Sequence, residues 1–166
     1  TVNCANNAAT AISNILTGAR VPAAGTFLAQ LYYGAAGLAD DSTFVSVPGA
    51  PATFTLAGQV LAGARSTTLA GGAIGSFQIR AWEASLGATW DLAYPAWLSG
   101  APGPVLGKSG IIQVKTADPA AVPPGTPTSL ITGTGLTGFY LTPVPEPSVI
   151  ALGALGLAAL LYRRRK

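Results

Sequence analysis

The alternation of apolar and polar side chains predicts a strand-rich protein, and it is clearest over residues 74–84. An extended chain places successive side chains on opposite faces. In this segment the two faces carry Phe77, Ile79 and Ala81 on one side, and Gln78, Arg80 and Trp82 on the other. A period of two over this length is typical of a β-strand.

Further short apolar runs, separated by Gly, Pro, Ser and Thr, predict more strands. They cover residues 1–5, 26–33, 43–47, 53–62, 66–69, 110–116 and 136–141. Within 53–62 we expect Gly58 to form a bulge. Residues 6–25 and 117–128 read as loops, the first with room for a short helix over residues 8–16.

A short helix is predicted over residues 89–98, where Trp90, Tyr94 and Trp97 have helical spacing. Thr89 is a candidate cap, and Pro95 limits the length. Seven or eight short strands with this one helix indicate a mainly β protein. The expected fold is an antiparallel β-sandwich followed by a single C-terminal hydrophobic helix.

The C-terminal segment has three parts: Pro145-Glu146-Pro147, fifteen uncharged residues over 148–162, and four basic residues. As a helix the uncharged run is about 22 Å long, against roughly 30 Å for a bilayer core. Tyr162 as an interface anchor, with snorkelling of the basic residues, makes up part of the difference. The basic residues are Arg163, Arg164, Arg165 and Lys166. The alternative is a buried core helix.

This order of Pro145-Glu146-Pro147, apolar helix and basic end resembles the PEP-CTERM sorting signal of Gram-negative bacteria. The resemblance implies an exported protein whose Pro-Glu-Pro segment is recognised by a membrane-embedded exosortase, in bacteria that produce extracellular polysaccharide or biofilm. Residues 29–32, 78–82, 107–109 and 138–139 also resemble exported PEP-CTERM proteins, but imply no activity. The domains are then an exported β-domain (1–142), a Pro-Glu-Pro linker (143–147) and a sorting or anchor helix (148–166).

Composition and charge agree with a single exported domain. The 166 residues carry a net charge of +3, yet four of the nine basic residues are the last four, and the rest carry five basic against six acidic residues. This distribution excludes a basic nucleic-acid-binding surface. The chain has no Met, so we expect Thr1 to be a processed end behind a signal peptide.

Candidate chemistry is sparse. The lack of His excludes imidazole-based catalysis and metal sites, and the single cysteine excludes an intrachain disulfide. Cys4 remains a candidate for an intermolecular disulfide, or a small buried side chain. We expect no catalytic residue, no metal and no cofactor.

Four aromatic residues are candidates for glycan stacking or, alternatively, for filling a core. They are Trp82, Trp90, Tyr94 and Trp97. Arg80 is expected to pack on Trp82 by a cation–π contact.

Three weaker patterns favour ordinary structural roles. Gly107-Lys108-Ser109 lacks the upstream glycine of a phosphate loop. Glu83 and Asp91 would be the carboxylate pair of a glycosidase. Asp40-Asp41 would belong to a calcium loop, and a plain turn is the simpler reading.

The expected function is that of a non-enzymatic structural protein of the cell surface or extracellular matrix. It would be anchored in the inner membrane in transit, with exosortase, copies of itself and extracellular polysaccharide as partners, and no nucleic acid. A sharper form of this hypothesis is that copies of the protein assemble into a filament or layer, since the chain has few charges and many small residues. The alternative is a carbohydrate-binding module of the biofilm matrix; a carboxylate hydrolase is third.

Overall fold

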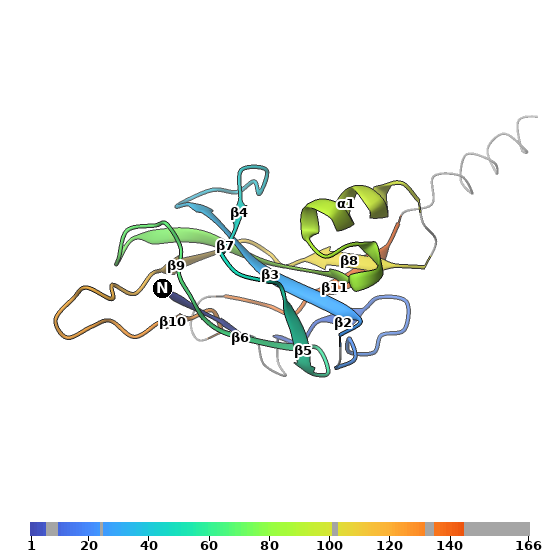
Figure 1. Cartoon of the computed structure of the whole chain (residues 1–166), viewed down its shortest axis with the longest axis horizontal. Coiled ribbons are helices and arrows are strands. Elements are labelled where there is room, and N and C mark those ends of the chain that lie inside the picture. Colours follow the sequence, from blue (N-terminus) through green and yellow to red (C-terminus); the bar gives the residue numbers. More distant parts are fainter. Residues whose placement is uncertain (6–9, 24, 101–102, 132–134, 145–166) are drawn as a thin grey trace, which may run out of the picture.

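The computed structural model of the chain describes residues 1–5, 10–23, 25–100, 103–131 and 135–144 (Figure 1). The described part is mainly β, with one α-helix, α1 (Trp90–Leu98), and a 3₁₀ turn at Ala84–Leu86. The strands are β1 (Val2–Ala5), β2 (Ser13–Asn14), β3 (Phe27–Ala35), β4 (Val45–Ser46), β5 (Ala52–Leu56), β6 (Gln59–Arg65), β7 (Ile74–Glu83), β8 (Val105–Lys108), β9 (Ile112–Lys115), β10 (Thr128–Ser129) and β11 (Tyr140–Pro143).

These strands form one connected sheet in the order β10-β1-β6-β5-β3-β7-β8-β11-β2. β4 pairs with β3 and β9 with β7, off this path. The centre is the antiparallel ladder between β3 and β7, which runs without a break from Phe27 opposite Glu83 to Ala35 opposite Gly75. The sheet curls into a half-barrel, so the mainly β class is confirmed and a two-sheet sandwich is not.

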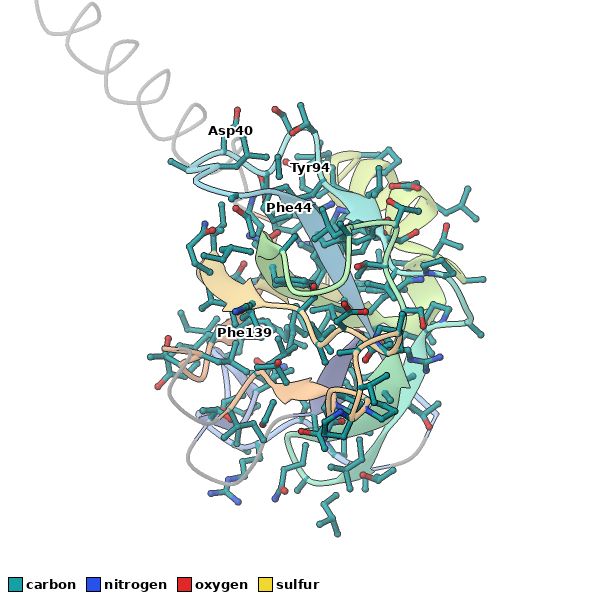
Figure 2. The ribbon with its side chains drawn as sticks, turned by 90° about the vertical axis from the view of Figure 1, so that its left-hand side faces the viewer. Asp40, Phe44, Tyr94 and Phe139 are labelled. Carbon is teal, nitrogen blue, oxygen red and sulfur yellow. The ribbon has the colours of Figure 1, made fainter. Side chains whose placement is uncertain are left out.

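The curl gives the sheet an inner and an outer face with separate cores. The inner core includes Phe77, Ile79 and Ala81 of β7. On the outer face, α1 covers Trp82 and Leu106, and Phe44 joins the same cluster. The alternation predicted for β7 is therefore confirmed, although both of its faces are buried. In Figure 2 the labels of Phe44, of the outer cluster, and Phe139, which packs on the inner core, lie apart in the view.

Several local predictions are wrong in instructive ways. Gly58, at φ +71°, makes the turn between β5 and β6 instead of a bulge, because the chain reverses there. Residues 66–69 form no strand, and β2 occupies part of the segment offered as a helix over 8–16. β8 was not predicted, because the glycine and proline residues around it conceal a strand of only four residues.

The predicted C-terminal helix, with residues 145–147 and 162–166, lies outside the described residues. Within the described ranges, no helix is long and apolar enough to cross a bilayer.

Candidate functional site

The helix α1 packs on β7 and β8 and forms one side of the candidate site. Its buried side chains are Trp90, Ala93 and Trp97. The indole of Trp97 donates a hydrogen bond to the carbonyl of Thr142 in β11 (3.1 Å), which ties α1 to the last strand. Beneath the helix Trp82 is fully buried, donates to the carbonyl of Gly87 (2.8 Å) and meets Trp90 edge to face at 6.0 Å.

Three aromatic rings form a nearly parallel row along α1. Tyr94 lies 5.6 Å from Trp90 and 6.1 Å from Trp97, between ring centroids. Trp90 and Trp97 are buried, whereas Tyr94 is 42% exposed. The helical spacing therefore does bring these three together, and Tyr94 is the ring that the surface presents.

A polar network lies on the sheet beside this row. The guanidinium of Arg80, on β7, donates from Nε to the side-chain oxygen of Gln78 (3.0 Å) and from Nη2 to the backbone carbonyl of Asp41 (3.0 Å). Gln78 in turn donates to the carbonyl of Ser109 (3.1 Å). These bonds hold a charged side chain that is only 9% exposed in a fixed position.

Arg80 also lies over two aromatic rings, at 4.0 Å from the centroid of Tyr32 and 5.3 Å from that of Trp90. The prediction that Arg80 packs on Trp82 is wrong. The ring that Arg80 reaches is Tyr32, because Tyr32 is its diagonal neighbour on β3. Burial raises the pKa of Tyr32 to about 12, the charge of Asp91 adds to this, and Arg80 acts in the opposite direction. Burial lowers the pKa of Arg80, and Asp41 partly offsets this effect.

Asp41 joins the cations of two strands. Arg80 and Lys108 stand directly opposite each other on β7 and β8, where like charges repel. The carboxylate of Asp41 lies 2.6 Å from the Lys108 ammonium and 3.6 Å from the guanidinium. Burial alone would raise the pKa of Asp41, but the hydrogen bond and charge of Lys108, with Gln78 and Arg80, lower it below its ordinary value. Asp41 is therefore an anion at neutral pH.

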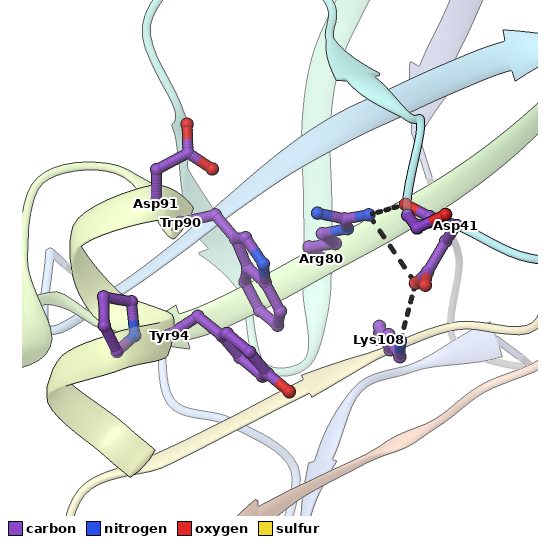
Figure 3. A pocket seen from close by; sticks show the side chains of 8 residues that line it. Asp41, Arg80, Trp90, Asp91, Tyr94 and Lys108 are labelled. Atoms are coloured by element: carbon purple, nitrogen blue, oxygen red, sulfur yellow. Dashed lines mark hydrogen bonds and ion pairs between the residues drawn. The ribbon is translucent and has the colours of Figure 1, made fainter. Parts of the chain in front are cut away.

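The row and the network face each other across an open cleft of about 450 Å³ (Figure 3). It is lined by Asp41, Ser42, Arg80, Trp90, Asp91, Tyr94, Pro95 and Lys108. In Figure 3 the rings come from α1 on one side, and Arg80, Asp41 and Lys108 lie on the other. A cleft of this size, with aromatic walls and a few convergent polar groups, is typical of a small-ligand site.

Of the four aromatic candidates for stacking, Trp90 and Tyr94 reach this cleft. Trp82 is 0% exposed, so the structure does not support it as a ligand platform. Trp97 is buried beside the cleft and supports Tyr94.

The weaker candidates take structural places. Gly107 and Lys108 lie within β8, which gives a phosphate no helix N-terminus. Asp40 accepts from the backbone of Ser42 in a turn (2.9 Å), and no group of metal-binding side chains occurs among the described residues. Asp91 lines the cleft, but Glu83, the other member of the candidate carboxylate pair, is not among the lining residues.

Cys4 is buried in β1, where burial raises the pKa of its thiol to about 11, against a smaller lowering by Arg65. A protonated thiol without access to solvent does not form a disulfide between chains. The structure therefore does not support Cys4 as an intermolecular link and agrees with its alternative as a small buried side chain.

We expect the substitution Asp41→Asn to lower the free energy of unfolding by about 2 kcal/mol at pH 7, because it leaves the buried Arg80 without its counter-charge. The pKa of Asp41 is lower in the folded chain, so its stabilisation exists above the unfolded value of 3.8 and is lost as the pH falls through the folded value. Urea unfolding at pH 7 and pH 2.5 measures both effects.

The matched control is Asp40→Asn, at an exposed neighbour that keeps its turn with Ser42. It should change stability by less than about 0.5 kcal/mol at both pH values. A loss in Asp41→Asn that is equally large at pH 2.5 would contradict the ionic origin of the effect.

Comparison with known proteins bears on the end of the chain. A family model of the PEP-CTERM protein-sorting motif matches residues 143–166. No curated protein and no solved structure matches the chain.

Proposed function

We propose, from the premise that this chain is a PEP-CTERM exosortase substrate, that it is a non-enzymatic structural protein of the cell surface or extracellular matrix. The motif implies export and membrane-associated sorting. One observation carries the proposal: the last strand, β11, ends at Pro143, which is also the first residue of the matched sorting motif. A folded β-domain is thus followed directly by the sorting signal.

The groups in the cleft favour a non-catalytic role. Asp41 is held between two cations with a low pKa, so it is a poor proton donor at neutral pH. A glycosidase also needs a carboxylic acid that protonates the leaving group, and Asp41 does not suit that role. Asp91 is the other carboxylate in the cleft lining, and the chain has no His that could donate the proton instead.

Sorting is tested in the native host with the full precursor, tagged within the exposed loop over residues 119–127. Replacement of Pro145, Glu146 and Pro147 by alanine is expected to leave most of the protein in the inner-membrane fraction, whereas the unmodified chain reaches the outside. Immunoblots of cell fractions measure this. Pro127→Ala, an exposed proline outside the motif, is the control. Equal export of the triple variant would contradict the proposal.

Self-assembly is the sharper version of the structural role. Edge-to-edge pairing has little support in the described part, because the path of the sheet ends in the two-residue strands β10 and β2. Exposed apolar side chains such as Leu56 and Leu61 on the β5–β6 hairpin offer another contact. Sedimentation of the native protein as monomers alone would contradict this version.

The second candidate function is a carbohydrate-binding module of the matrix. The cleft between α1 and β8 favours it, since aromatic and hydrogen-bonding side chains converge there.

A further inference from the structure

We propose that the cleft between α1 and β8 is a binding site for one neutral sugar ring of a polysaccharide. The site would use the exposed ring of Tyr94, backed by the buried Trp90, for stacking, and Asp41, Arg80 and Lys108 for hydrogen bonding. This inference rests on the second candidate function and assigns it a place, a set of residues and a class of sugar.

The aromatic side of the cleft suits the faces of a pyranose. Such a ring has a face of C–H groups and a rim of hydroxyls, so it is amphipathic in the same way as the cleft. Tyr94 is the most exposed ring of the row, and Trp90 lines the cleft beside it. Burying C–H groups against the exposed ring of Tyr94 removes apolar surface from water on both partners.

The opposite side supplies both kinds of hydrogen-bonding group. The carboxylate of Asp41 accepts, and the ammonium of Lys108, which is 51% exposed, donates to neighbouring oxygens. Both are already 2.6 Å apart. Two adjacent hydroxyls of a sugar, each a donor and an acceptor, match such a donor–acceptor pair.

The charge balance points to a neutral sugar. Two cations, Arg80 and Lys108, and two carboxylates, Asp41 and Asp91, line the cleft, so its formal charge is zero. Asp41 also forms ion pairs with both cations, and Asp91 supplies the second negative charge. A uronate or sulfated sugar would gain no net attraction there and would meet the carboxylates.

The site is also held in place before any ligand arrives. Gln78, Tyr32 and the backbone of Asp41 fix the guanidinium of Arg80, and Trp97 stacks on Tyr94. Burying a charged network beneath a surface costs desolvation energy that an apolar filling would avoid. Its presence beside an exposed ring favours a binding role, because rigid groups lose little entropy on binding.

The experiment uses the full 166-residue chain in a detergent without a sugar headgroup. The probes are neutral gluco-, manno- and galacto-tetrasaccharides, with a galacturonate tetrasaccharide of the same length. Calorimetry and the intrinsic fluorescence of the three tryptophans, of which Trp90 lines the cleft, measure binding. We expect a neutral probe to bind with a dissociation constant of about 1 mM or below, insensitive to 0.5 M NaCl, since a single open cleft gives modest affinity.

Tyr94→Ala is expected to weaken this binding at least tenfold, and Lys108→Ala about threefold. Leu98→Ala, an exposed residue on the same helix outside the cleft, should leave it unchanged. Circular dichroism verifies that each variant is folded.

Each other outcome overturns part of the inference. Salt-sensitive binding of galacturonate above the neutral probes would overturn the neutral class. If a neutral probe binds and Tyr94→Ala leaves this binding intact, the assignment of the site to this cleft is overturned. A carbohydrate-binding function elsewhere on the protein would then remain. Absence of binding to every probe would overturn both, while the proposal of exosortase-sorted export would stand on its own test.

Discussion

Replacement of Trp82 by alanine is expected to lower the free energy of unfolding by about 4 kcal/mol or more. The side chain extends from β7 and is fully buried beneath α1, and among the described residues it is the largest that is fully buried. Its loss leaves a cavity on the outer face of the sheet and an unpaired carbonyl at Gly87. Urea unfolding followed by circular dichroism measures the change.

Trp82→Phe separates the two contributions, because it keeps an aromatic ring and loses the indole donor. It should cost about half as much. Leu98→Ala, exposed on α1, should cost less than about 1 kcal/mol. A Trp82→Ala protein within 1 kcal/mol of the unmodified chain would contradict the view that the outer core holds α1 in place.

The elements with a local signal could be predicted from the sequence. The segments 74–84 and 26–33 predict β7 and β3, because the pattern of apolar and polar side chains that indicates a strand lies within each segment. α1 follows from the spacing of three aromatic residues within one segment. The sequence alone therefore located the two strands of the central ladder and the aromatic row, but it did not predict that the two strands pair.

The polar half of the cleft has no such local signal. Asp41 and Lys108 are 67 residues apart, and their contact depends on the turn that precedes β4 and on the register of β8 against β7. The Arg80–Tyr32 contact likewise depends on pairing of β3 with β7. Registers of this kind are set by the whole sheet, so the site emerges only from the fold.

Gly107 gives the second large expected effect: Gly107→Ala should destabilise the protein by about 2–3 kcal/mol. A Cβ at this position would run into the backbone carbonyl of Tyr140 and would lie 3.2 Å from a methyl of Leu141. Neither strand can yield easily, because β8 is paired with β7 on one side and with β11 on the other. Urea unfolding at pH 7 measures the loss.

Gly110→Ala is the matched control, since a Cβ there meets no atom within 4 Å and the residue has an ordinary φ. It should be neutral or slightly stabilising. Equal stability of the two variants would show that β8 and β11 adjust freely. A large difference in stability between the two variants would show that Gly107 is needed where β8 and β11 approach closely. Strand packing, and not phosphate binding, then explains the glycine of Gly107-Lys108-Ser109.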